Sequence, residues 1–166
     1  AKGLSGGLPQ SALVGRRELM DIYAPNTMTS THSGSPVASA GTAANIKFLK
    51  EHNMCEEALR KGKIMEEKLK ALWKQFPERI SYVSGIGMAW AVTFAEADTH
   101  AIHPEFALEV TKKCNENGLT FFAAVGAGIT MKLTPPLTIP DDALIEGLEA
   151  YATAVAEADA IMPAYK

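Results

Sequence analysis

Helical and β-prone patterns alternate from residue 54 onward, and this order limits the possible folds more than any other feature of the sequence. The segment 54–76 carries four apolar side chains at helical spacing: Met65, Leu69, Leu72 and Phe76. The remaining segments are a β-prone run at 80–94, a helix at 104–117, strands at 119–125 and 129–133, and a helix at 140–160. This order predicts an α+β fold with helices on one face of a small antiparallel sheet.

Turn and cap residues define these segments more closely. Gly85 and Gly87 allow the run 80–94 to be one strand or two strands broken at the glycines. The turn 126–128 predicts a hairpin between the strands 119–125 and 129–133. Asn117-Gly118 suits a left-handed helix end, and Thr138 with Asp141 has the spacing of a capping box.

The first 52 residues have a different character. A glycine-rich stretch leads to a short predicted strand at 11–15, one or two helical turns at 17–23, and a Ser/Thr-rich loop at 24–34. A long alanine-rich helix follows at 36–52, with Ser35 as the expected N-cap and Pro36 at its first position. Its many small side chains predict close packing against neighbours. Because this region has one strand and no sheet, we expect two parts, residues 1–52 and residues 53–166.

Composition excludes several classes of protein. The chain of 166 residues is 47% hydrophobic and 21% charged with a formal net charge of -3, which argues against disorder. No basic run indicates nucleic-acid binding, and no stretch approaches the roughly 20 apolar residues of a membrane span. The two cysteines form no CxxC pair, and the glycine-rich start lacks the apolar run of a signal peptide. We therefore expect a cytoplasmic protein.

Few residues indicate chemistry by pattern alone. Lys2 lies in a glycine-rich loop, although most single lysines are solvated surface charges. His100 and His103 are three residues apart, but no third ligand follows at a recognisable spacing, so we predict no metal site. No GxSxG, HExxH or GxxxxGK[ST] pattern occurs in the chain.

Four segments taken together are more informative. Residues 1–16 place Lys2 before small residues, Gly-Gly, an apolar residue, Pro and a Gly-Arg end. Three further segments follow in order: TSTHSGSP at 29–36, VSGIGM at 83–88 and KLTPPLTI at 132–139. In order and spacing these segments resemble the C-terminal half of class III aminotransferases, the ornithine/GABA/acetylornithine aminotransferase-like enzymes that depend on pyridoxal 5'-phosphate.

The resemblance implies a fold and a set of roles. The fold would be a fold-type I PLP-dependent transferase, with residues 1–52 ending the large domain and residues 53–166 forming the small C-terminal domain. Lys2 would be the catalytic Schiff-base lysine, which holds the cofactor aldehyde and then shuttles a proton. Thr31 would bind the cofactor phosphate of the neighbouring subunit, which implies a homodimer. Small-molecule amines and keto acids would be the substrates.

Departures from the family pattern also matter. Lys132 stands where many members have an arginine that binds the substrate carboxylate, and lysine replaces a planar two-pronged contact with a point charge. Ser35 replaces the usual asparagine, and Ser84 replaces an arginine. The substrate is therefore left open. The family's glycine/serine phosphate loop, ring-stacking aromatic residue and ring-nitrogen aspartate belong to an upstream half, so we expect these 166 residues alone to be inactive or nearly so.

Three functions remain open from the sequence. The first is part of an aminotransferase that moves an amino group between an amine or amino acid and a keto acid or aldehyde. The second keeps the family but changes the reaction to that of an epimerase, aminomutase or decarboxylase. The third is a non-catalytic α+β module that binds a partner or its own copies through a patch exposed at the small side chains of residues 36–46.

Overall fold

The computed structural model describes residues 3–24, 27, 31–96, 101–102, 104–122 and 128–163. The chain divides into two compact units, Ala1–Met54 and Cys55–Lys166. Helix α2 (Pro36–Glu51) and helix α3 (Met54–Gln75) are separated by two residues, His52 and Asn53. Asn53 has a positive φ of 47°, a conformation that asparagine tolerates better than most residues and that ends the helical path of α2.

The described part of the first unit contains two helices, α1 (Arg17–Met20) and α2. Both were predicted, but the strand prediction for residues 11–15 is wrong: these residues form no strand. A strand needs a neighbour for its backbone groups, and the described part of this unit offers none. Pro36 begins α2 as predicted, whereas the Ser35 side chain makes no capping hydrogen bond. Of the α2 residues only Ala38 is buried, so the predicted close packing is absent within the described chain.

The second unit is built on a three-stranded antiparallel sheet in the order β1-β2-β3. Strands β1 (Ile80–Ile86) and β2 (Ala89–Phe94) form a hairpin whose turn contains Gly87 at φ 55°. Strand β3 (Thr130–Leu133) pairs with β2. The predicted hairpin of β3 with residues 119–125 is wrong for residues 119–122, which form no strand, and residues 123–127 lie outside the described part.

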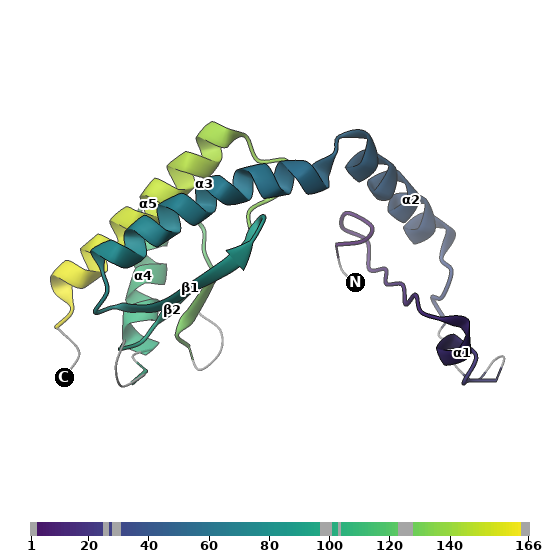
Figure 1. The fold of residues 1–166 in the computed structure, drawn as a ribbon, viewed down its shortest axis with the longest axis horizontal. Helices are drawn as coiled ribbons and strands as arrows, with labels where there is room; N and C mark the ends of the chain where they lie inside the picture. The colour runs from purple at the N-terminus through teal and green to yellow at the C-terminus, as the bar shows by residue number, and fades with distance from the viewer. Residues whose placement is uncertain are drawn as a thin grey trace. The chain divides into compact units, whose positions relative to one another are not determined.

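Three helices cover one face of this sheet: α3, α4 (Pro104–Glu116) and α5 (Asp141–Ile161). Figure 1 shows α3 and α5 side by side, and an ion pair between Lys68 and Glu149 joins them at 2.7 Å. In the part of the chain that the structure describes, no helix is long and apolar enough to cross a membrane. The predicted arrangement of helices on a small antiparallel sheet is confirmed.

The core of the second unit lies between the sheet and these helices. Alternate residues of β2 and β3 are buried, and the predicted helix stripes supply the other side of the core. The largest fully buried side chains include Met65, Phe94, Phe106, Met131 and Tyr151. Helix α3 comes very close to the β1–β2 turn: a Cβ atom placed on Gly62 would lie 2.6 Å from the Cα of Gly87. Only glycine at position 62 allows this packing.

The helix ends follow the sequence prediction in one case and not in the other. Gly118 has a φ of 80° and ends α4 in the left-handed conformation, as Asn117-Gly118 predicted. The capping box predicted from Thr138 and Asp141 does not form, because Pro140 is the N-cap of α5 and makes no side-chain cap. The Asp141 carboxylate instead accepts hydrogen bonds from Arg60 on α3.

Candidate functional site

The glycine-rich segment after Lys2 forms a compact turn in the first unit. Lys2 itself lies outside the described residues, which begin at Gly3. Ser5 is buried, and its hydroxyl donates a hydrogen bond to the carbonyl of Leu8. Gly6 at φ 71° and Gly7 at φ 145° take backbone conformations that other residues adopt at a cost. The glycines that suggested a loop are therefore needed for its path.

Helix α2 supports this turn through one polar side chain. The Asn45 side-chain amide donates to the carbonyl oxygens of Gly3 at 3.1 Å and Leu4 at 3.0 Å. A Cβ atom on Gly41, one turn earlier, would lie in ordinary contact with Leu8 and Ser5. Sequence reasoning missed Asn45, because an asparagine within an alanine-rich helix carries no local sign of a partner more than 40 residues away.

Thr31 lies at the start of a turn that leads into α2. Residues 31–34 form this turn, in which the Ser35 N–H donates to the His32 carbonyl at 3.3 Å. Thr31 is exposed, and Gly34 in the same turn has a φ of 68°. The Thr31 hydroxyl is thus at the surface of the first unit. Thr29, from the same sequence motif, lies outside the described residues.

Lys132 lies on β3 in the second unit. Its neighbours Met131 and Leu133 are buried in the core, so the exposed Lys132 belongs to the opposite face of the sheet. Across the strands Lys132 is opposite Ala91, which is opposite Ser84. Ser84 and Lys132, which both differ from the residue usual in the family pattern, therefore lie in the same cross-strand row. Small neighbours leave the lysine side chain room on this face.

An apolar cavity of about 380 Å³ includes Lys132 in its lining. It is bounded by residues 119–122, by the segment that follows β3, and by the first turns of α5. Its lining is mainly Leu, Ile, Phe and Pro, with Lys132 as the one charged residue. Such a cavity can hold the apolar part of a small molecule.

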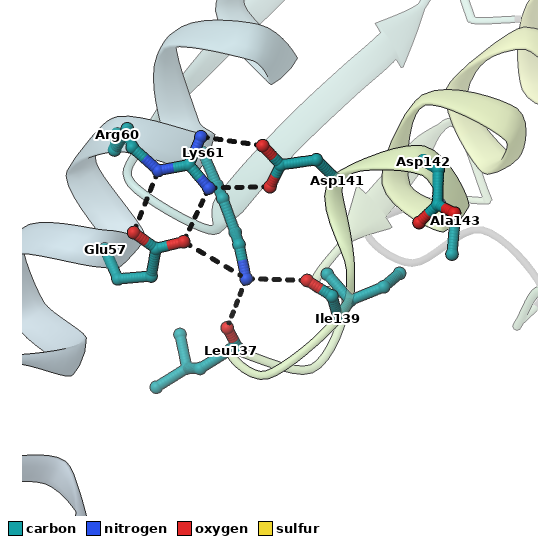
Figure 2. A network of polar contacts seen from close by, with 8 residues as sticks. All are labelled: Glu57, Arg60, Lys61, Leu137, Ile139, Asp141, Asp142 and Ala143. Atoms are coloured by element: carbon teal, nitrogen blue, oxygen red, sulfur yellow. Dashed lines mark hydrogen bonds and ion pairs between the residues drawn. The ribbon is translucent and has the colours of Figure 1, made fainter. Parts of the chain in front are cut away.

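A polar network fixes the segment between β3 and α5 (Figure 2). Lys61 on α3 is buried, and its ammonium donates to the carbonyls of Leu137 at 3.0 Å and Ile139 at 2.6 Å. Glu57 lies 3.5 Å from the same ammonium. Lysine is buried only when paired, and here two carbonyls and a carboxylate surround it. The network therefore holds the proline-rich segment that lines the cavity.

Arg60 extends this network to α5. Its guanidinium donates to both carboxylate oxygens of Glu57 and of Asp141, at distances between 2.5 and 2.8 Å. The hydrogen bonds from Arg60 lower the pKa of Glu57 and of Asp141, and the two carboxylates raise the pKa of Arg60. The charged residues at this end of α3 thus join it to α5.

Cys114 is buried in the core of the second unit. Burial raises the pKa of the Cys114 thiol to about 12, so it remains protonated and unreactive. Among the described residues, no group of three or more His, Cys, Asp or Glu side chains could hold a metal ion. His100 and His103 lie outside the described residues.

Comparison with known proteins identifies the family. The family model for "Aminotransferase class-III" matches residues 1–155. The chain belongs to the class III aminotransferases. Its resemblance to them, inferred from four short segments, is confirmed.

Class III aminotransferases from bacteria are among the similar curated proteins. The chain is 31% identical over 148 residues to 5-aminovalerate aminotransferase DavT of Pseudomonas putida, which covers 89% of the chain and 35% of that protein. It is 28% identical over 150 residues to 4-aminobutyrate aminotransferase GabT of Escherichia coli, and the match covers 90% of the chain and 35% of that protein. The chain thus spans about a third of the length of the curated relatives it matches.

Solved transaminase structures share the fold. A transaminase obtained by ancestral reconstruction aligns with a TM-score of 0.74 at 26% identity, covering 83% of this chain and 31% of that one. An S-selective transaminase from Arthrobacter aligns with a TM-score of 0.73 at 23% identity, and the alignment covers 88% of this chain and 34% of that one. The α+β fold of this class III chain is therefore that of PLP-dependent transaminases.

Of the two residues assigned to the cofactor, the described part of the chain includes Thr31 alone. Pyridoxal 5'-phosphate needs a primary amine for its aldehyde and hydrogen-bond donors for its phosphate. The exposed Thr31 hydroxyl can donate to a phosphate oxygen.

Proposed function

We propose that this chain is the part of a class III aminotransferase that carries the cofactor-binding lysine, one phosphate ligand and one substrate-binding cation. The observation that supports this most is the family match over residues 1–155, a range that includes Lys2, Thr31 and Lys132. The four segments of family resemblance lie within the same range. The residue roles are carried over from the family pattern onto these positions.

Each of the three residues would have one task. The Lys2 amine would hold the cofactor aldehyde and, once an incoming substrate amine has displaced it, would move a proton at the substrate carbon that bears the amino group. The Thr31 hydroxyl donates to the cofactor phosphate. The Lys132 ammonium holds a substrate carboxylate. When bound, pyridoxal 5'-phosphate supplies an electron sink for the bonds at that carbon.

The proposed substrates are amino acids whose reacting amino group is distant from the carboxylate. Relatives named for 5-aminovalerate and 4-aminobutyrate support this class. Lys132 also favours it, because a point charge on a flexible side chain can hold a carboxylate at the end of a flexible substrate. The amino acceptor would be a keto acid or an aldehyde.

Racemisation is the second candidate reaction. The chain is 33% identical over 160 residues to a leucine/methionine racemase of Thermococcus litoralis, which covers 96% of the chain and 35% of that protein. A racemase moves a proton at the same carbon but transfers no amino group. The two reactions differ in one observable: only the aminotransferase requires a keto acid.

Assembly and location follow from the same proposal. A homodimer would let Thr31 of one subunit serve the cofactor of the other, as the family pattern implies. We propose a cytoplasmic protein that acts on small molecules. We expect the 166 residues alone to show little or no turnover.

Reductive trapping of the cofactor tests the role of Lys2. The chain is incubated with pyridoxal 5'-phosphate, reduced with borohydride and mapped by peptide mass spectrometry, with Lys2→Ala as the control. We expect selective labelling of Lys2 over the other lysines and the amino terminus. Labelling spread evenly over the lysines would contradict the assignment.

A further inference from the structure

Asn45 makes contacts that its place in the helix does not explain. Its side-chain amide donates to the carbonyls of Gly3 and Leu4, at 3.1 and 3.0 Å. These carbonyls belong to the first and second residues after Lys2. An asparagine in a helix interior is unfavourable, because its side chain competes for nearby backbone groups. Here the side chain is directed to a distant segment instead.

The segment that Asn45 holds is rich in glycine. It contains Gly3, Gly6 and Gly7, and glycine loses more conformational freedom on ordering than any other residue. A Cβ atom on Gly6 would lie 3.6 Å from the Asn45 side-chain oxygen, so Gly6 packs against the same amide. Asn45 therefore contacts the turn on both sides of the buried Ser5.

The side-chain amide has the right chemistry for this task. Its two N–H groups can serve two acceptors, and two successive carbonyls fix the orientation of two successive peptide planes. The first of these planes begins one residue after Lys2. The anchored backbone therefore begins directly after the residue that the proposed function assigns to the cofactor aldehyde.

We propose that Asn45 is a positioning residue for Lys2: by binding the Gly3 and Leu4 carbonyls, it holds the backbone that directly follows the lysine proposed to bind the aldehyde of pyridoxal 5'-phosphate. The proposal rests on the proposed function, which assigns the aldehyde to Lys2. Asn45 lies on α2, and it would influence cofactor binding only through the turn 3–8. Asn45 itself contacts no reacting atom in this role.

Three variants of Asn45 in the full 166-residue chain separate the possible effects. Asn45→Leu removes the polar atoms at similar size, Asn45→Asp keeps the shape but removes both donors, and Asn45→Gln keeps the amide. Ser39→Leu, exposed on the same helix, is the matched control for placing a leucine on α2. Circular dichroism confirms that α2 is retained in each variant.

Two readouts are measured on each variant. Without cofactor, amide hydrogen exchange of residues 3–8 should accelerate about tenfold in Asn45→Leu and Asn45→Asp, the factor expected from the net loss of a hydrogen bond. With pyridoxal 5'-phosphate and borohydride, the preference for Lys2 over other lysines should fall several-fold in both. Asn45→Gln should recover part of both effects, and Ser39→Leu should resemble the wild type.

Each other result has a distinct meaning. Unchanged exchange in residues 3–8 would overturn the proposal, because the contact would then not hold the turn. Faster exchange with undiminished Lys2 preference would also overturn it, since Asn45 would then hold the turn without directing the lysine. Even labelling of all lysines in the wild-type chain would refute the assigned role of Lys2 itself, and the Asn45 proposal with it.

Discussion

The two units of this chain differ in how much of their own apolar surface they bury. In the second unit, three helices and a sheet enclose a continuous core whose largest members are fully buried. In the described part of the first unit, only Ser5 and Ala38 are buried. Leu13, Val14 and Val37 are each at least 70% exposed. The second unit thus contains the partners for its apolar faces, and the first unit does not.

This difference matches the division of tasks between the units. The residues assigned to the cofactor, Lys2 and Thr31, belong to the first unit, where the order of the turn 3–8 depends on a few polar contacts such as those of Asn45. Lys132 lies instead on a strand whose neighbours are fixed by the core. A site residue on a packed sheet is held precisely by its own unit, whereas one on an exposed turn needs added contacts.

Separating the units should have the largest effect. We expect residues 55–166, produced alone, to unfold cooperatively in urea with a free energy of unfolding of about 5 kcal/mol or more. Residues 1–54 alone should show no cooperative transition, because little apolar surface is buried there. Circular dichroism and tryptophan fluorescence measure the first unfolding, and circular dichroism alone the second. A cooperative transition in residues 1–54 would show that the first unit has a core of its own.

Substitution at a single glycine should give the next largest effect. Gly62→Ala places a Cβ 2.6 Å from the Gly87 backbone, so the hairpin turn must move away from α3. We expect this to destabilise the second unit by about 1–3 kcal/mol, more than the roughly 1 kcal/mol that alanine gains over glycine in a helix. Urea denaturation of the whole chain measures the change.

Gly147→Ala on α5 is the matched control for this substitution. Its Cβ would meet only a Leu119 methyl group at 3.7 Å, an ordinary contact. This variant should be as stable as the wild type or more stable by up to about 1 kcal/mol. If both variants behaved alike, the close approach of α3 to the β1–β2 turn would be contradicted.

The sequence predicted the second unit better than the first for a physical reason. Periodic stripes such as Met65, Leu69 and Leu72 are buried because the core they face lies within the same unit. The strand at 11–15 was predicted from local β-propensity, which gives no hydrogen-bond partner. The strand prediction for residues 119–122 was wrong for the same reason, since β3 pairs with β2 instead.

Site residues could be predicted only where a short sequence motif marks them. Glycines around Lys2 and the proline-rich segment after Lys132 are visible in sequence, and they led to the family. The contacts of Asn45 with Gly3 and of Lys61 with Leu137 join residues 42 and 76 positions apart. No periodicity marks such pairs, because each helix position is compatible with many partners in space.

Substitution of Arg60 should have the smallest effect on the stability of the second unit, and this effect should depend on pH. In the folded chain Arg60 lowers the pKa of Glu57 and Asp141 below their ordinary values of 4.5 and 3.8. Carboxyl groups of this kind contribute stability above their unfolded-state pKa, and they lose it as the pH falls through the lowered values. Arg60→Met should therefore lower the melting temperature at neutral pH, and the difference from wild type should vanish in acid.

Salt and a neighbouring residue sharpen this last test. Arg60 and its partners are partly exposed, so high salt at neutral pH should weaken the difference as well. Lys63→Met, an exposed cation on the same helix, is the control and should show neither dependence. A melting-temperature difference for Arg60→Met that persisted unchanged in acid would mean that its methylene chain, rather than its charge, joins α3 to α5. The second unit would then depend on apolar packing even at its polar edge, and its contrast with the first unit would be greater still.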